Sequence, residues 1–259
     1  MVVRGKNINY YVYITKGQVN LPLIWRLEGK SLSVLKEKFI ETFVTDNRYV
    51  FFVQGLRNTL VITLFAVLIG IFIGFIVAIV RTTYEKTGKL KILNAIFQIY
   101  LTVIRGTPAM VQLLIMYYII MAGSNNKILI AILTFGINSG AYVAEVVRSG
   151  IMSIDKGQFE AGRSLGFNYV QTMWYVIVPQ AFKNVLPALC NEFITLLKET
   201  SISGYIALND VTRAGDIVRS LTYEPFFALF TVALIYLVLV VVLTALVGKL
   251  ERRLRAGDR

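Results

Sequence analysis

Charged and polar residues interrupt several long apolar stretches of this sequence. The ionisable ones are Arg105, Glu145 and Glu192, with Lys183, Lys198 and Glu199 close to the ends of such stretches. The neutral hydrogen-bonding residues there are Thr107, Gln112, Asn138, Tyr142, Thr200 and Ser201. Ionisable groups inside apolar segments are costly to bury, so they are candidates for a functional site. A purely structural alternative is that Glu145 pairs with Arg105, holding two helices together, or with Arg148 one turn further on.

The sequence lacks the residues of common catalytic and metal sites. It contains no histidine, which excludes imidazole-ligated metals and histidine acid–base chemistry. The single cysteine, Cys190, lies in an apolar stretch and is interpreted as a packing residue. The tripeptide Gly29-Lys30-Ser31 could end a phosphate-binding loop, but position 24, where that loop needs glycine, is isoleucine. We therefore expect no enzyme activity and no nucleotide site in this chain.

The composition indicates an integral membrane protein. Hydrophobic residues make up 56% of the chain and charged residues only 16%, whereas soluble domains are about 25% charged. The mean hydropathy is +0.64. On a soluble protein the net charge of +12 would suggest nucleic-acid binding, but basic residues also collect on the cytoplasmic flanks of membrane spans.

Five stretches are long and apolar enough to cross the bilayer as helices, which takes about 20 residues. They cover about 50–80, 93–122, 128–148, 171–197 and 225–248. The fourth is the least apolar, because it carries Lys183 and Glu192, and Pro179 and Pro187 are expected to kink it. Two glycine pairs have the spacing that lets helices approach closely, and chance or packing within the chain is favoured over a dimer seam. The pairs are Gly70/Gly74 and Gly136/Gly140.

The basic residues predict an orientation. Twelve lie in the segments 81–91 and 148–172 and in the tail from 249, and four lie in the segments on the opposite side. Because the richer side is normally cytoplasmic, we expect a cytoplasmic C-terminus and, with five spans, an outer N-terminus. Residues 1–49 carry eight basic residues on the expected outer side, which the rule constrains less strictly in a long tail. Within this tail, residues 31–43 predict an amphipathic helix, either lying along the membrane interface or packed against the bundle.

A short polar helix is expected between the third and fourth spans. Asp155 and Gln158 have capping-box spacing at its start, and Gly166 is suited to the left-handed conformation that ends helices. A second helix is expected to begin at once, since Asn168 and Gln171 repeat the capping arrangement. Ala161 and Gly162 make one face of the short helix small, and a partner surface could approach it closely. Without further information, the segment could equally be a simple connector.

Several motifs together resemble the permease subunits of ABC importers, in particular the polar amino acid uptake group. The short helix and the apolar run that follows it resemble the "EAA" loop of these permeases through Glu160, Ala161, Gly166 and Pro179. Four further motifs match in the same order, namely QGLRNTL (54–60), IRGTPAMVQ (104–112), AYVAEVVRSGIMSIDKGQFEAG (141–162) and LLKETSIS (196–203). The resemblance covers about residues 50–250. It departs from the family pattern at Gly162, where alanine is usual, and in the length of the N-terminal tail.

The resemblance implies an all-α integral membrane protein with the five-transmembrane-helix fold of ABC type I permeases and a cytoplasmic coupling helix. Residues 1–49 would be an N-terminal extension, 50–252 the transmembrane domain and 253–259 a cytoplasmic tail. The implied partners are a cytoplasmic ATPase dimer that uses ATP and Mg²⁺, a second permease subunit, identical or related, and an external solute-binding protein. No cofactor is expected in this chain, and its location would be the cytoplasmic membrane.

The resemblance also suggests roles for the residues above. An amino acid needs a cation or donor for its carboxylate and an acceptor for its ammonium group. The expected solute pathway is Arg105, Thr107, Gln112, Asn138, Tyr142, Glu145, Glu192, Lys198, Thr200 and Ser201. The expected ATPase-coupling residues are Gln158, Glu160, Ala161, Gly162, Ser164, Leu165 and Gly166. Import of another small polar solute, or a membrane scaffold or sensor without transport, are the alternatives.

Overall fold

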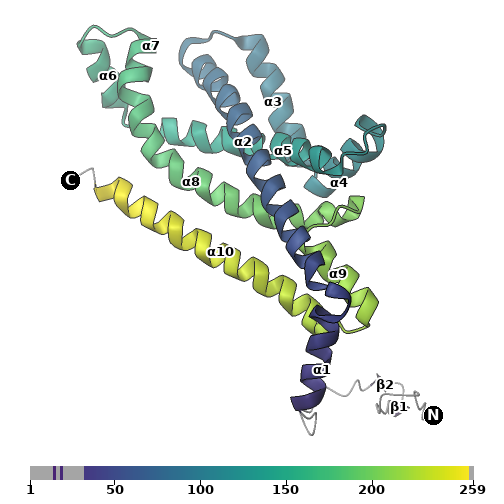
Figure 1. The fold of residues 1–259 in the computed structure, drawn as a ribbon. Helices are drawn as coiled ribbons and strands as arrows, with labels where there is room; N and C mark the ends of the chain where they lie inside the picture. Colours follow the sequence, from purple (N-terminus) through teal and green to yellow (C-terminus); the bar gives the residue numbers. More distant parts are fainter. Residues whose placement is uncertain (1–13, 16–17, 20–31, 257–259) are drawn as a thin grey trace.

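The structure, a computed structural model, describes residues 14–15, 18–19 and 32–256 (Figure 1). In chain order the elements are β1 (Ile14–Thr15), β2 (Gln18–Val19), α1 (Leu32–Phe43), η1 (Thr45–Asn47), α2 (Tyr49–Thr87), α3 (Lys91–Gly106), α4 (Ala109–Ile115), η2 (Met116–Ile120), α5 (Lys127–Met152), α6 (Lys156–Ser164), α7 (Tyr169–Thr172), η3 (Met173–Ile177), α8 (Val178–Glu199), η4 (Thr200–Ile206), α9 (Val211–Thr222) and α10 (Pro225–Ala256). The described chain is therefore almost wholly helical, and its two short strands pair antiparallel with Ile14 opposite Val19.

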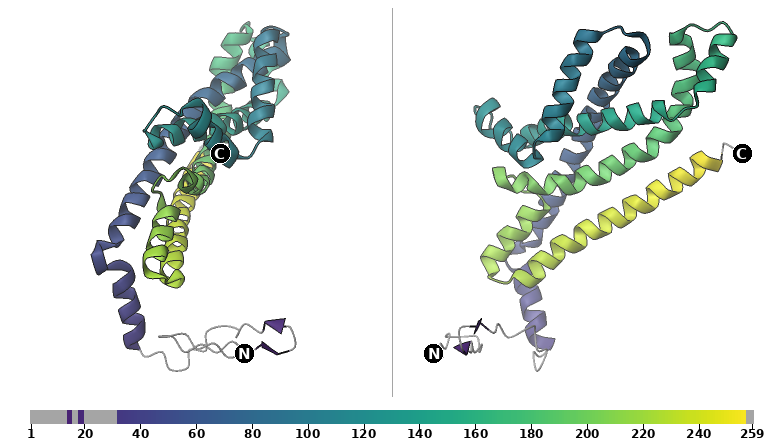
Figure 2. Two further views of the ribbon diagram at one scale, coloured as in Figure 1. Left: turned by 90° about the vertical axis from the view of Figure 1, so that its right-hand side faces the viewer. Right: turned by 180° about the vertical axis from the view of Figure 1, so that it is seen from behind.

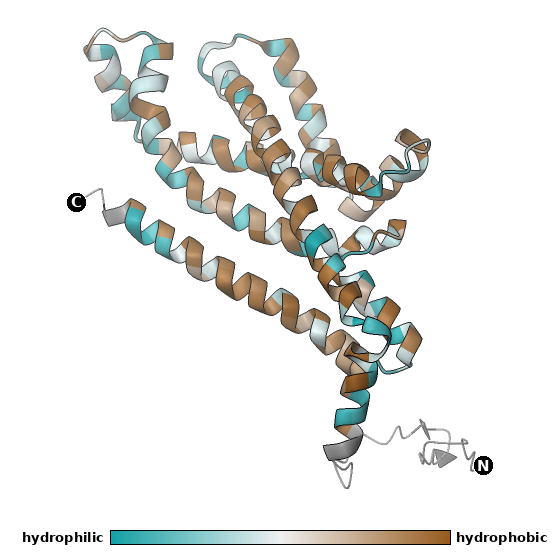
Figure 3. Ribbon diagram, viewed as in Figure 1, coloured by the Kyte–Doolittle hydropathy of each residue, from teal (hydrophilic) through white to brown (hydrophobic). Residues whose placement is uncertain are grey.

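Three of the described helices, α2, α5 and α10, are each long and apolar enough to cross a membrane. Figure 3 shows the apolar residues running along α10 and the middle of α2. The helices α3 and α4–η2 together qualify as a fourth, bent span. The least apolar expected span is built from α7, η3 and α8, and α8 carries Lys183, Glu192 and Lys198.

The second expected span, about 93–122, is not one continuous helix. The chain bends by 106° between α3 and α4. Thr107 is extended, with φ −120° and ψ 143°, because the ring of Pro108 disfavours helical backbone at the preceding residue. The side-chain nitrogen of Gln112 donates to the carbonyl oxygens of Ile104 at 2.7 Å and Thr107 at 3.1 Å. The amide thus satisfies backbone acceptors that the break would otherwise leave unpaired in an apolar environment.

The fourth expected span continues through both of its prolines. Pro179 lies in the first turn of α8, directly after the wide turn of η3. A π-helical turn is a common way for a helix to absorb a local disturbance of its hydrogen-bond ladder. Pro187 lies inside α8, which runs on to Glu199.

The core of the bundle is the close crossing of α2 and α5. A methyl group added at Gly74 would come within 2.4 Å of Val143 Cγ1, and one added at Gly70 within 2.8 Å of Ser139 Oγ. On α5, Gly136 and Gly140 in turn approach Ile69 and Ile73 of α2. The two glycine pairs therefore serve packing within the chain, since each glycine makes room for a side chain of the other helix.

The helix α1 packs against the bundle rather than standing apart from it. Lys38 forms an ion pair with Glu224, just before α10, and the ring of Phe39 lies 6.3 Å from that of Phe227. The Phe43 and Phe52 rings, 6.0 Å apart, link α1 to α2. Phe39 and Ile40 nevertheless remain exposed, at 51% and 41% of their surface. Figure 2 shows α1 at the end of the molecule opposite to α6 and α7.

At that same end, α9 docks on the first turns of α2. Asp210 caps α9 by accepting hydrogen bonds from the backbone of Thr212 at 3.3 Å and Arg213 at 2.9 Å. Asn58 of α2 donates to the carbonyl of Asn209 at 2.8 Å. The Asp210 side chain is fully buried in this junction, and its burial raises its pKa from 3.8 to about 6.

Candidate functional site

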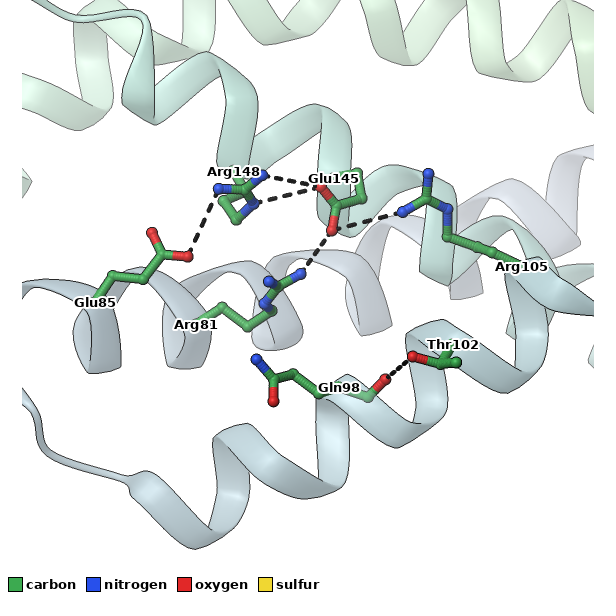
Figure 4. A network of polar contacts seen from close by, with 7 residues as sticks. All are labelled: Arg81, Glu85, Gln98, Thr102, Arg105, Glu145 and Arg148. Carbon is green, nitrogen blue, oxygen red and sulfur yellow. Dashed lines mark hydrogen bonds and ion pairs between the residues drawn. The ribbon is translucent and has the colours of Figure 1, made fainter.

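Two of the charged residues predicted inside the spans, Arg105 and Glu145, come together at one place. Arg105, at the end of α3, lies 3.7 Å from Glu145 Oε1, and Arg148 contacts Oε2 of the same carboxylate at 3.2 Å (Figure 4). Arg81, near the end of α2, makes the shortest contact to Glu145, at 2.6 Å. Glu85, one turn beyond Arg81, reaches back to Arg148 at 3.6 Å. Both ion pairs considered from the sequence are thus present, and they are parts of a larger network.

This network carries an excess of positive charge, because three arginines share two glutamates. Its arginines differ in exposure and in the length of their contacts to Glu145. Arg81 is well enclosed, with 17% of its side chain exposed, whereas Arg105 is 45% exposed and makes the longest contact to Glu145. The Nε atom of Arg81 is buried and has no hydrogen-bond partner among the described residues. The exposure of Arg105 and its long contact leave donors available to an additional anionic group.

A pocket of about 630 Å³ opens on this network, a volume in the range of small-molecule sites. Its lining is largely polar and consists of Arg81, Gln98, Leu101, Thr102, Arg105, Gly106, Tyr142 and Glu145. The guanidinium of Arg105 lies 5.8 Å from the centre of the Tyr142 ring, within reach of a cation–π contact. An apolar pocket of about 500 Å³ between α2, α5, η3 and α8 has no charged lining residue. Only the first of these two pockets can neutralise a charged solute.

Of the polar lining residues, Arg81, Gln98 and Thr102 were not predicted as site residues. The sequence placed the end of the first span at about residue 80, so Arg81 was counted only as a flanking positive charge. In the structure α2 continues to Thr87, and Arg81 and Glu85 lie one turn apart facing α5. The spacing of four between Arg81 and Glu85 is the signal that could have revealed them. Gln98 and Thr102 share a face of α3 for the same reason.

Three neutral residues of the expected pathway form a second group at the break between α3 and α4. Gln112 donates to Thr107 Oγ1 at 2.8 Å, and Asn138 of α5 donates to the side-chain oxygen of Gln112 at 3.0 Å. Asn138 lies seven residues before Glu145, so the two are about 10 Å apart along α5. Through these hydrogen bonds the three residues stabilise the break between α3 and α4.

The remaining pathway candidates do not line the charged pocket. Glu192 of α8 accepts a hydrogen bond from Ser139 Oγ at 3.0 Å. Thr200 is fully buried and donates to the carbonyl of Leu197 at 2.8 Å, which uses its hydroxyl within the end of α8. Lys198 is exposed and Ser201 half-buried at the same end. The structure thus groups the predicted pathway residues along the bundle and does not bring them into a single site.

The predicted short helix is α6, and its ends are built as expected with one exception. Asp155 caps it by accepting from the Gly157 backbone at 2.6 Å, but Gln158 does not complete a capping box. Gln158 instead accepts a hydrogen bond from Gln180 of α8 at 3.2 Å. At the other end Gly166 has φ +82°, as predicted. Two backbone bonds, Gly166 N to Arg163 O and Phe167 N to Gly162 O, form the Schellman closure of the helix.

The helix that follows starts as predicted, with a complete capping box between Asn168 and Gln171 in α7. The tight turn between α6 and α7 also explains Gly162. A methyl group there would lie 2.6 Å from Thr172 Cγ2, so the small residue lets α6 pack on α7 and does not face outward. Glu160, Ala161, Ser164 and Leu165 are exposed, Leu165 at 73%. They leave an open face on α6 that no described part of this chain covers.

The chain resembles known transport proteins over most of its length. Residues 66–256 match the family described as "Binding-protein-dependent transport system inner membrane component". The arginine transport system permease protein ArtQ of Bacillus subtilis (strain 168) is 37% identical over 211 residues, which are 80% of this chain and 94% of that protein. The glutamine transport system permease protein GlnP of Escherichia coli (strain K12) is 33% identical, over 78% of this chain and 92% of that protein.

Two solved structures share the fold. A crystal structure of an amino acid ABC transporter with histidines has a TM-score of 0.74 and 41% sequence identity, and covers 82% of this chain and 98% of its own. The inward-facing MetNI methionine ABC transporter has a TM-score of 0.70 at 19% identity, over 80% of this chain and 97% of its own. At that identity the second likeness concerns the fold alone.

Proposed function

Since this chain belongs to the family of inner membrane components of binding-protein-dependent transport systems, we propose that it carries an amino acid through the charged pocket around Glu145. The chain is a multi-pass membrane permease with the type I importer fold, and α6 is its cytoplasmic coupling helix. ATP hydrolysis belongs to a separate ATPase, and a solute-binding protein delivers the solute. The proposal names the amino acid as the solute and this pocket as the place where it binds.

The observation that carries the proposal is the mixture of charges in the pocket. Arg105 is the exposed, loosely held arginine, and the guanidinium of Arg81 lines the same pocket. A carboxylate placed between them would be held by charge-assisted hydrogen bonds. Glu145 supplies the acceptor for the ammonium group, once the solute's carboxylate has drawn an arginine away from it. Relatives that are named as arginine, glutamine and cystine permeases support the same class of solute.

The ATPase would dock on the open face of α6. Glu160, Ala161 and Leu165 lie exposed there, while Phe159 and Gly162 hold the helix on its own bundle. We take the ATPase to be a dimer and the complete permease to contain a second copy of this chain or a related one. The apolar surface of α10, which is almost entirely exposed, is compatible with a lipid or subunit environment.

The proposed orientation places α6 and the C-terminus in the cytoplasm and α9 and the N-terminus outside. It rests on the twelve-to-four distribution of basic residues. Single cysteines placed at Asn125 and Lys89, both exposed, test it in a Cys190→Ser background. An impermeant maleimide added to whole cells should label position 125 and not position 89, and the opposite pattern would reverse the topology.

The solute class is tested by uptake into proteoliposomes that contain the permease, its ATPase and its binding protein. A mixture of the twenty radiolabelled L-amino acids identifies what accumulates. For the amino acid found, the decarboxylated amine and the N-acetylated acid should compete poorly, because each lacks one of the two charges that the pocket pairs. Equal competition by either analogue, or accumulation of no amino acid, would contradict the proposal.

A further inference from the structure

The end of α2 touches both the charged pocket and the coupling helix. Two of its side chains face the pocket network: Arg81 contacts Glu145, and Glu85 contacts Arg148 (Figure 4). The next residue, Lys86, turns to the other side and places its ammonium group 4.7 Å from the centre of the Phe159 ring in α6. One turn of helix therefore joins the site proposed for the solute to the helix proposed to meet the ATPase.

Phe159 contacts α2 in a way that would transmit a movement of α2 to α6. It is half-buried and packs against the apolar cluster formed by α2, α5, η3 and α8, so it is the inward-facing side chain of α6. Other attachments of α6 come from α7, η3 and α8, among them Thr172 against Gly162 and Gln180 to Gln158. Lys86 adds a contact from α2. Movement of α2 relative to α8 would therefore change the seating of α6.

The lengths of the ion pairs indicate which contact in the network can shorten. The contact from Glu85 to Arg148 is 3.6 Å, longer than the 2.7–2.9 Å of a well-formed charge-assisted hydrogen bond. When a solute carboxylate draws Arg81 away from Glu145, Arg148 becomes the main partner of Glu145 and can close on Glu85 as well. Closure of the longer pair would pull the last turn of α2, and Lys86 with it, toward α5.

We propose that Lys86 and Phe159 are positioning residues that pass the state of the solute pocket to the coupling helix through the last turn of α2. The inference rests on the proposed function, because it takes the pocket around Glu145 as the solute site. Neither residue lines that pocket. Their loss should therefore leave solute binding intact and weaken only its effect on ATP hydrolysis.

The test is ATP hydrolysis by the reconstituted complex, with and without binding protein and the twenty-amino-acid mixture. Lys86→Met keeps the length of the side chain but removes the cation, so stimulation over the basal rate should fall about two- to fivefold, as expected for losing an exposed cation–π contact. Lys86→Arg keeps a cation over the ring and should retain wild-type stimulation. Lys89→Met, just beyond the end of α2, is the matched control and should resemble wild type.

A double-mutant cycle decides whether the two residues act together. Phe159→Leu removes the ring, and Lys86→Met combined with it should lower stimulation no further than either change alone. Solute binding to each variant, measured by radioligand retention, should match wild type. Wild-type stimulation in Lys86→Met, an equal loss in Lys86→Arg, or full additivity in the double variant would each overturn the inference. A wild-type complex that no amino acid stimulates would instead refute the proposed function itself, and this inference with it.

Discussion

The crossing of α2 and α5 can be tested by adding a single methyl group at Gly74. That group would lie 2.4 Å from Val143 Cγ1 and 2.9 Å from the backbone nitrogen of Ala144, whereas ordinary contacts begin near 3.4 Å. Rotation of Val143 could relieve the first contact but not the second, since a backbone atom cannot turn away. Gly74→Ala should therefore force the two helices apart by roughly 1 Å and cost about 1–3 kcal/mol, the usual range for overpacking.

The control for this substitution is Gly248→Ala in α10, where no atom lies within 4 Å of an added methyl group. Because alanine favours helix over glycine, this variant should be as stable as wild type or up to about 1 kcal/mol more stable. Unfolding in mixed micelles by an SDS titration measures both changes. A double variant of Gly74→Ala with Val143→Ala should lose less stability than the sum of the single changes, since removal of Cγ1 relieves the shortest contact, although the contact with Cβ at 2.6 Å remains.

The reasoning would be refuted if Gly74→Ala and Gly248→Ala proved equally stable. It would also fail if the combination with Val143→Ala were strictly additive. Either result would mean that α2 and α5 are not in close contact at this level.

Two further predictions concern the ends of the molecule. Gly166→Val forces a β-branched residue into φ +82°, and Ala161→Trp fills the open face of α6. Both variants should insert into the membrane but lose most of the stimulation of ATP hydrolysis by loaded binding protein. Stimulation and uptake at wild-type levels in both variants would mean that α6 is only a connector. Burial raises the pKa of Asp210 to about 6, so the folded state favours the protonated side chain. This preference contributes at most about 3 kcal/mol to the free energy of unfolding, and the contribution is lost as pH rises from about 4 through 6. Asp210→Asn keeps an oxygen to cap α9 and should lose that part of the pH dependence in melting curves between pH 4 and 8; identical curves for the two proteins would contradict it.

The positions of the helices and the coupling loop could be predicted from local patterns. Apolar runs of sufficient length gave α2, α5 and α10, and the capping residues Asn168 and Gly166 act where they were expected to. The break in the second span was not foreseen, although Pro108 marks it. A proline in an apolar run is compatible with a kinked helix as well as with a broken one, and the choice depends on whether partners such as Gln112 satisfy the freed carbonyls.

The charged pocket could be predicted only in part. Arg105 and Glu145 stand out because each interrupts an apolar run, and they do lie together. Arg81 did not stand out, because a basic residue at the end of an apolar run is the ordinary marker of a membrane boundary. Its role depends on how far α2 extends and on the rotation of α2 against α5, which the close glycine contacts determine. The four-residue spacing of Arg81 and Glu85 is the local signal of this geometry, and it does not show which helix the two residues face.

The central claim, that the pocket around Glu145 holds an amino acid by both of its charges, is tested most directly by equilibrium binding to the purified permease–ATPase complex without the binding protein. Retention of the radiolabelled amino acid identified by uptake should be saturable in wild type. Arg105→Met and Glu145→Gln should each weaken it at least about tenfold, the loss expected for one charge-assisted bond. Arg219→Met, which removes an exposed arginine from α9, should leave it unchanged. Undiminished binding by both pocket variants in assembled complexes would show that the solute binds elsewhere.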